Sequence, residues 1–319
     1  MSKLTDLTPR LDPEFAAIFG ALPKPAGPAN VATSRAMLRQ MVGMLLQQLP
    51  AGEPVPHEDR EIPGAPGAPA VPVRIFRPAQ GTSDSVFVWI HGGGFVAGHH
   101  EDDALVAIPW VRATGCTVVS VGYRLAPEAK APGPTEDCYA ALCWAADKAA
   151  HLGFVPRKLA IGGMSAGGCL AAATVLMARD RGGPQACLQM LLIPVIDNRH
   201  QTPSMHEIAD PRTWNQTSSR AAWEMYAGPE YLGELSPYIA PARAKNLAGL
   251  PPCYMEVAEI DPLRDEAIEY ATRLMQAGVH TELHVYPGAC HASTLMFPNA
   301  AVSRRAFADC TAALKAALA

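Results

Sequence analysis

The chain has 319 residues, of which 49% are hydrophobic and 18% are charged, and its formal net charge is −4. This composition allows a large buried core and excludes global disorder, while the negative charge argues against nucleic acid as a partner. No stretch reaches the ~18 consecutive apolar residues of a membrane span and the N-terminal sequence lacks the layout of a signal peptide, so we expect a cytoplasmic protein without stable membrane insertion.

The first element in chain order is a predicted helix over residues 31–49, VATSRAMLRQMVGMLLQQL. Its apolar residues recur at helical spacing, and this face carries Met37, Met41, Met44, Leu45 and Leu49. A connector rich in proline and glycine follows and breaks regular structure. We therefore assign residues 1–50 to N-terminal cap helices.

The rest of the chain alternates short β-rich runs with helical stretches such as 136–150 and 166–180. Near-continuous apolar strands separated by helices are typical of a parallel sheet covered on both faces. The prediction is a mostly parallel, eight-stranded α/β sheet whose strands lie at 58–62, 71–78, 85–90, 116–124, 158–163, 187–196, 252–258 and 281–286.

One stretch, residues 198–248, is too long for a plain connection between two strands. We expect it to form a cap insertion over the sheet together with the N-terminal helices. The α/β catalytic core then comprises residues 51–197 and 249–319.

The sequence Gly163-Met164-Ser165-Ala166-Gly167 is a G-x-S-x-G motif that follows the predicted strand KLAIGG and opens a helix. A nucleophile elbow requires this context, because the turn is so tight that its outer positions must lack side chains. Ser165 is then a nucleophile, and the backbone N–H of Ala166 can stabilise an oxyanion. The alternative is a helix-start turn with a capping serine.

A second motif, His91-Gly92-Gly93-Gly94-Phe95, follows the strand SVFVWI. Backbone N–H groups of glycines can approach a substrate oxygen closely, so Gly92 and Gly93 are candidate oxyanion donors beside Ala166.

The same glycines also satisfy the dinucleotide pattern as Gly92-x-Gly94-x-x-Ala97, and Arg124 could meet a 2′-phosphate after the next strand. The polar run GHHEDD delays the helix that should hold the pyrophosphate. An NADP-dependent oxidoreductase is therefore the weaker alternative.

A nucleophilic serine needs a general base and an acid that orients it. His291 lies on the predicted loop after the last strand, and Asp261 follows the strand PCYMEVA, so the chain order is Ser165, Asp261, His291. Asp261 also precedes a proline and a helix and could serve only as a helix cap. Asp265 and Asp197 are the other candidate acids.

Four motifs in order, HGGGF, YRLAPE (123–128), GMSAGG and DPLRDE (261–266), resemble the hormone-sensitive-lipase-like, or bacterial family IV, carboxylesterases of the α/β-hydrolase superfamily. The resemblance covers residues 70–319. It implies a serine carboxylester hydrolase that acts on small-molecule esters of short to medium acyl length, with a helical cap and no cofactor. It also implies Ser165 as nucleophile, Asp261 as acid and His291 as base. The implied oxyanion donors are Gly92, Gly93 and Ala166.

Two positions depart from the usual pattern of this family. Met164 stands where an Asp, Thr or Glu usually precedes the nucleophile, and His291-Ala292-Ser293 stands where the family often has His-Gly-Phe. Neither departure removes a catalytic group. A non-catalytic receptor on the same fold is a further alternative, but such receptors typically lose the base.

Several other signals are given structural interpretations. Residues 99–103, HHEDD, are interpreted as a solvated loop and not as a metal site, because adjacent residues rarely point at one ion. The eight cysteines include no C-x-x-C pair, so we expect buried thiols, and packing accounts for Cys169 and Cys290. The cap Met and Trp residues are expected to pack internally, with one or two touching substrate. The sequence leaves open whether the protein is a homodimer.

Overall fold

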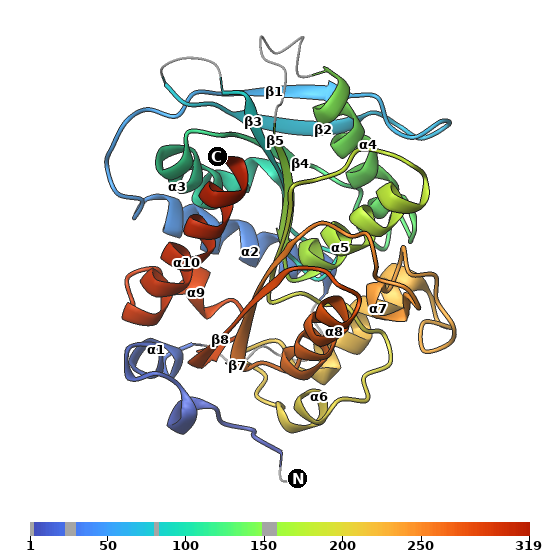
Figure 1. Cartoon of the computed structure of the whole chain (residues 1–319). Helices are drawn as coiled ribbons and strands as arrows, with labels where there is room; N and C mark the ends of the chain where they lie inside the picture. The colour runs from blue at the N-terminus through green and yellow to red at the C-terminus, as the bar shows by residue number, and fades with distance from the viewer. Residues whose placement is uncertain (1–2, 23–29, 80–82, 149–157) are drawn as a thin grey trace.

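The computed structural model describes residues 3–22, 30–79, 83–148 and 158–319. Its centre is one eight-stranded sheet with helices on both faces (Figure 1), as the sequence predicts. The strands are β1 (His57–Ile62), β2 (Val71–Phe76), β3 (Ser85–Ile90), β4 (Thr117–Val121), β5 (Lys158–Met164), β6 (Leu188–Leu192), β7 (Cys253–Ile260) and β8 (Thr281–Cys290).

The strand order is β1-β2-β4-β3-β5-β6-β7-β8. Strand β2 pairs antiparallel with both β1 and β4, and every later pair is parallel. The carboxyl ends of β3, β5, β7 and β8 therefore meet at one edge of the sheet. Ligands in open α/β sheets bind outside these ends, so the topology brings the sequence motifs together there.

Strand β8 is longer than predicted. The segment PGAC, expected as a loop before His291, continues the strand, and Cys290 pairs with Ile260 after a register irregularity beside Ala258. A proline is tolerated here because β8 is an edge strand and one side of its ladder is unpaired. His291 therefore follows the strand directly.

The helices divide between the two faces. Helices α3 (Ala104–Thr114) and α10 (Ala301–Leu318) cover one face, and α4 (Gly133–Lys148), α5 (Ala166–Asp180) and α8 (Arg264–Gln276) cover the other (Figure 1). All residues of β3, β4 and β6 are buried, which explains their unbroken apolar sequences. The helix predicted over 136–150 begins earlier, at Gly133, and its residues 149–150 lie outside the described part.

The N-terminal elements are η1 (Thr8–Arg10), α1 (Pro13–Phe19) and α2 (Val31–Leu46). Phe15 of α1 packs on Phe297, with ring centroids 5.3 Å apart, next to α9 (Ser293–Met296). In α2, the expectation of one buried methionine face is wrong, because Met37 and Met44 are 54% and 53% exposed. The helix instead turns Leu38, Met41, Val42 and Leu45 toward the interior.

The stretch 198–248 contains the helices α6 (Pro203–Glu207), α7 (Gln216–Ala227) and η4 (Pro241–Arg243). In α7, Tyr226 stacks on Phe95 of the glycine motif with ring centroids 4.1 Å apart, and Trp223 packs on the same ring.

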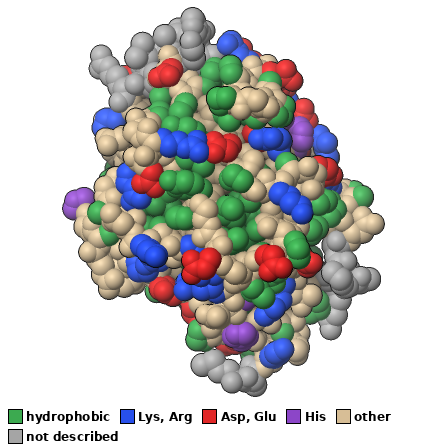
Figure 2. Space-filling model, turned by 90° about the vertical axis from the view of Figure 1, so that its right-hand side faces the viewer, with side chains coloured by type: hydrophobic (Ala, Val, Ile, Leu, Met, Phe, Trp, Pro, Cys, Tyr) green, Lys and Arg blue, Asp and Glu red, His purple; other side chains and the backbone are tan. Residues whose placement is uncertain are grey.

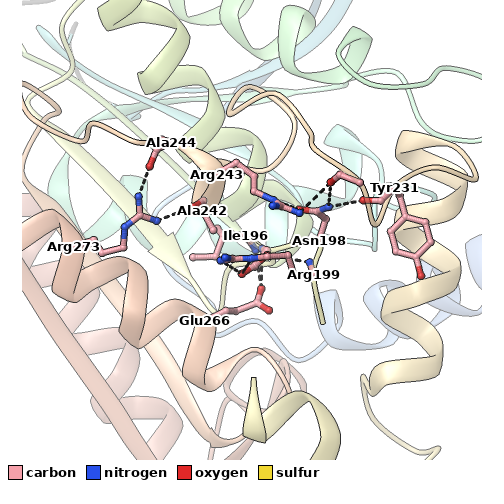
Figure 3. A network of polar contacts seen from close by, with 11 residues as sticks. Ile196, Asn198, Arg199, Tyr231, Ala242, Arg243, Ala244, Glu266 and Arg273 are labelled. Carbon is pink, nitrogen blue, oxygen red and sulfur yellow. Dashed lines mark hydrogen bonds and ion pairs between the residues drawn. The ribbon is translucent and has the colours of Figure 1, made fainter. Parts of the chain in front are cut away.

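A polar network ties this stretch to the core (Figure 3). Glu266 of α8 accepts backbone N–H groups from Ile196 (2.9 Å) and Asp197 (3.2 Å). Arg273, also on α8, donates to the carbonyl oxygens of Ala242 and Ala244. Glu266 and Arg273 of α8 therefore hold the backbone just before this stretch and near its C-terminal end.

The face over α4, α5 and α7 carries acidic and basic side chains interspersed with hydrophobic ones, without a large area of one charge (Figure 2). All eight cysteines are free, and six are buried, in agreement with the sequence. Within the described ranges, no helix is long and apolar enough to cross a membrane.

Candidate active site

Ser165 stands on the tight turn between β5 and α5. Its backbone is left-handed (φ 55°, ψ −116°), a strained conformation that raises the side chain above the sheet. A Cβ added at Gly163 would lie 2.2 Å from the Gly167 carbonyl oxygen, and one at Gly167 would lie 2.1 Å from the Ile90 carbonyl oxygen. Only glycine fits at either position. The serine does not cap α5, since its side chain makes no capping hydrogen bond.

The structure brings Ser165, His291 and Asp261 together. The Ser165 Oγ lies 3.0 Å from His291 Nε2, and His291 Nδ1 lies 2.7 Å from Asp261 Oδ2. The three residues are 6%, 9% and 1% exposed. This chain of hydrogen bonds can pass a proton from the hydroxyl to the imidazole while the carboxylate fixes the tautomer.

Asp261 uses both carboxylate oxygens. Its Oδ1 accepts the backbone N–H of Leu263 at 3.0 Å, while Oδ2 contacts His291. Helix α8 begins at Arg264, with Leu263 at the N-cap position, so Asp261 orders the turn before the helix without being the cap itself.

The two other candidate acids have different partners. Asp197 forms an ion pair with Arg199, and Asp265 accepts the Ser204 N–H at 2.7 Å and pairs with Arg264. Asp261 is therefore the one of the three that the structure places on His291.

The glycine motif curls beside the serine. Gly93 and Gly94 have φ values of +119° and +60°, and a Cβ at Gly93 would lie 2.1 Å from the Ala97 carbonyl oxygen. Gly92 faces the elbow, since a Cβ there would lie 3.5 Å from that of Ser165. Ala166 is the first residue of α5, where helical N–H groups have no partner within the helix. Gly92 and Gly93 line the cavity above Ser165.

The YRLAPE motif holds the glycine loop in place. The Tyr123 ring stacks on His91 with centroids 4.3 Å apart, and its hydroxyl donates to the His91 carbonyl oxygen at 3.0 Å. Arg124, the residue considered for a 2′-phosphate, forms a two-pronged ion pair with the buried Asp137. The first α-helix after the glycines begins only at Ala104. At the glycine motif, the arginine proposed for a 2′-phosphate is therefore engaged by Asp137, and no α-helix directly follows to hold a pyrophosphate.

A cavity of about 220 Å³ opens above the serine. Ser165, His291, the glycine loop and α2 line it, and two of the predicted cap residues, Met41 and Trp214, reach it. The Trp214 indole stacks on the His291 imidazole with centroids 5.8 Å apart. Leu38, Asp103 and Leu295 also line this cavity and were not predicted to do so. Helical spacing alone does not tell which side of a helix meets a cavity, and Asp103 was expected in a solvated loop.

The segment 99–103 is not a solvated loop as predicted. His99 and His100 stack with centroids 4.4 Å apart at the start of η2 (His100–Asp103), and His100 is only 6% exposed. Burial lowers the pKa of His100 to about 4 and raises that of Asp103 to about 8. Ligand atoms of His99, His100 and Glu101 lie within 4.8 Å of one another, because the tight turn stacks neighbouring side chains. The Glu101 carboxylate already forms an ion pair with Arg39.

The neighbouring cysteines are unsuited to nucleophilic chemistry. Burial raises the pKa of Cys169 well above its usual value and that of Cys290 to about 12. The reactive form of cysteine is the thiolate, so both side chains are packing groups.

The chain is similar to known proteins over nearly all of its length. A family model described as alpha/beta hydrolase fold matches residues 87–295. The chain is 38% identical to Esterase LipI of Mycobacterium tuberculosis, over 77% of this chain and 78% of that protein. It is 34% identical to Carboxylesterase NlhH of the same organism, over 100% of this chain and 99% of that protein.

Solved structures give the same result. A structure titled Bacterial Heroin Esterase is 42% identical and covers 98% of this chain and 100% of its own, with a TM-score of 0.93. A hyperthermophilic esterase from Pyrobaculum calidifontis is 35% identical and covers 97% of this chain and 100% of its own, with a TM-score of 0.88.

Proposed function

This chain belongs to the alpha/beta hydrolase family, among its hormone-sensitive-lipase-like carboxylesterases, and we propose that it hydrolyses carboxylic esters with Ser165, His291 and Asp261 as its catalytic triad. The observation that carries the proposed triad is the continuous hydrogen-bond chain from the serine hydroxyl through the imidazole to a buried carboxylate.

In the acylation step, the Ser165 Oγ attacks the ester carbonyl carbon while its proton moves to His291 Nε2. The carbonyl oxygen becomes an oxyanion, and we assign the N–H groups of Gly92, Gly93 and Ala166 as its donors. Collapse of the tetrahedral intermediate breaks the bond to the alcohol oxygen, which leaves with the proton from the imidazole. The acyl group then remains on the serine as an ester.

In the deacylation step, His291 takes a proton from water, whose oxygen attacks the acyl carbon. The bond from this carbon to Ser165 Oγ then breaks, the imidazolium returns the proton to Oγ, and the carboxylic acid is released. Asp261 holds the Nδ1–H tautomer throughout and stabilises the imidazolium that forms twice in each turnover. No redox step or cofactor is part of this sequence of reactions.

The site favours esters with small acyl and alcohol groups. The cavity above Ser165 is about 220 Å³, below the ~300–1,000 Å³ that encloses drug-sized ligands. We assign α2 and the stretch 198–248 as the cap that closes this cavity, because Met41 and Trp214 come from them.

Hydrolysis of p-nitrophenyl esters from acetate to palmitate, beside amides and lactones, tests this function. We expect the highest kcat/KM with short to medium esters and little amide hydrolysis. Binding of these esters without turnover would instead indicate a receptor. Binding of NADPH, measured by fluorescence titration, would instead favour the NADP-dependent oxidoreductase.

A further inference from the structure

A second cavity lies beside the catalytic one and is larger, about 360 Å³ against 220 Å³. It is enclosed by the C-terminal end of α2, by α3, α9 and α10, and by one face of the sheet. Four side chains line both cavities: Leu105, Val106, Met164 and Leu295. The two spaces therefore adjoin at these four residues.

One side of this second cavity is a row of sheet residues that starts next to Ser165. Met164, Leu192 and Glu256 are in register on the adjacent parallel strands β5, β6 and β7. Residues in register point to the same face of a sheet, and all three line the cavity. Because neighbouring strands are ~4.8 Å apart, the row reaches about 10 Å from Met164. Its first member immediately precedes Ser165.

The lining is mostly apolar. Leu45, Pro109, Ala306 and Phe307 contribute hydrocarbon surface from three helices, and Leu49 does so from the segment after α2. A space of this kind suits an unbranched hydrocarbon chain, which is stabilised by the area it removes from water.

Two polar side chains on the wall of the second cavity, those of Glu256 and Ser303, are buried. Glu256 is 3% exposed, and its Oε1 accepts the Thr294 hydroxyl at 3.1 Å. Burial raises the pKa of Glu256 to about 7, which favours its neutral form. The hydroxyl of Ser303, 2% exposed, has no hydrogen-bond partner among the described residues, so replacing it breaks no hydrogen bond of this hydroxyl.

We propose that this second cavity binds the hydrocarbon chain of longer esters, and that Met164 and Leu295 form the movable partition through which the chain passes from the catalytic cavity. The inference rests on the proposed esterase function. In this proposal, rotation of the Met164 and Leu295 side chains joins the two spaces, and an unbranched methionine with three rotatable bonds suits such a partition. The chain can belong to the acyl or to the alcohol part of the ester.

The test fills the second cavity from the side remote from the triad. Ala306→Leu and Ser303→Leu each place a larger side chain into it from α10, and Ala308→Leu on the exposed side of the same helix is the matched control. The substrates are p-nitrophenyl acetate and octanoate, which vary the acyl chain, and ethyl and octyl acetate, which vary the alcohol.

We expect both filling variants to lower kcat/KM about tenfold or more for p-nitrophenyl octanoate, for octyl acetate or for both. Each lost methylene contact in a pocket can change specificity by roughly 10-fold or more. The acetate and ethyl acetate values should stay within about twofold of wild type, and the control should match wild type throughout. A loss confined to p-nitrophenyl octanoate would show that the acyl chain enters the second cavity, and a loss confined to octyl acetate would show that the alcohol chain does. Met164→Ala, which widens the partition, should raise the ratio of octanoate to acetate turnover.

Unchanged chain-length profiles in both filling variants, with melting temperatures near wild type, would overturn the inference. An equal loss on short and long esters would do the same, because it would reflect a general disturbance of the site. Wild-type protein that hydrolyses none of the four esters would instead contradict the proposed function, so the two failures are distinct.

Discussion

At the scale of single residues, the orientation of His291 depends on one carboxylate among three candidates. We predict that Asp261→Asn lowers kcat by up to roughly 10⁴-fold, because an amide stabilises the wrong imidazole tautomer. Asp197→Asn and Asp265→Asn should retain most turnover, since those carboxylates contact Arg199 and Arg264. Steady-state kinetics with melting temperatures for all three variants measures this. Normal turnover in Asp261→Asn with inactive Asp197→Asn would show that the acid is misassigned.

A second residue-scale prediction concerns the pH dependence of stability. Burial raises the pKa of Glu256 from 4.5 to about 7, so the folded protein holds this proton more tightly than the unfolded chain. This group therefore lowers the free energy of unfolding as pH rises from about 4.5 to 7. The groups facing it are Thr294 on α9, His284 on β8 and Asp309 on α10. The full pKa shift corresponds to a change of roughly 3 kcal/mol in the free energy of unfolding.

Glu256→Gln keeps a hydrogen-bonding side chain without the ionisation. We expect it to be more stable than wild type at pH 8, with a smaller or absent advantage at pH 5. Urea unfolding at both pH values measures the difference and cancels the contribution of other titrating groups such as Asp103. An identical pH dependence in the two proteins would show that Glu256 ionises freely in the folded state.

At the scale of elements, one arginine attaches α2 to the two loops that shape the site. Arg35 donates to the carbonyl oxygens of Val96 (2.7 Å) and Ala126 (3.1 Å) and pairs with Glu128. Val96 follows the glycine motif and Ala126 lies within YRLAPE. The position of α2, which carries Met41 into the catalytic cavity, is therefore coupled to the glycine loop.

We predict that Arg35→Ala raises KM about tenfold and lowers the melting temperature, because hydrogen bonds to a charged group contribute ~1.5–3 kcal/mol. Arg35→Lys should not restore the wild-type values, since an ammonium lacks the planar geometry that spans both carbonyls. Arg39→Ala is the control, because Arg39 lies one turn later, is 61% exposed and contacts only carboxylates. Equal effects at the two positions would mean that α2 is held by packing alone.

At the scale of the whole molecule, the strands, their parallel arrangement and the positions of Ser165, Asp261 and His291 were predictable from the sequence. Buried parallel strands have unbroken apolar sequences, and steric demands fix glycines around Ser165, so both leave a clear local signal. The continuation of β8 through PGAC has no local sequence signal, because it depends on pairing with β7.

The inward face of α2 was predicted incorrectly for a similar reason. Met37 and Met44 share helical spacing with Met41 but point to solvent, because the cavity under α2, and not the average hydrophobicity of its face, decides which residues are covered. The burial of His100 likewise depends on contacts with distant strands, since the Ser120 hydroxyl of β4 donates to its carbonyl oxygen. The adjoining second cavity has no sequence motif and appears only when three strands and four helices are assembled.

The central claim is that Ser165 is the nucleophile of an esterase, and covalent labelling by a fluorophosphonate tests it most directly. We predict one equivalent of label per chain, located on Ser165 by peptide mass spectrometry, with loss of esterase activity in proportion to labelling. Ser165→Ala should take up no label, lose roughly 10³-fold or more in kcat and melt near the wild-type temperature. Labelling of another residue, or near-normal activity in a folded Ser165→Ala variant, would contradict the account.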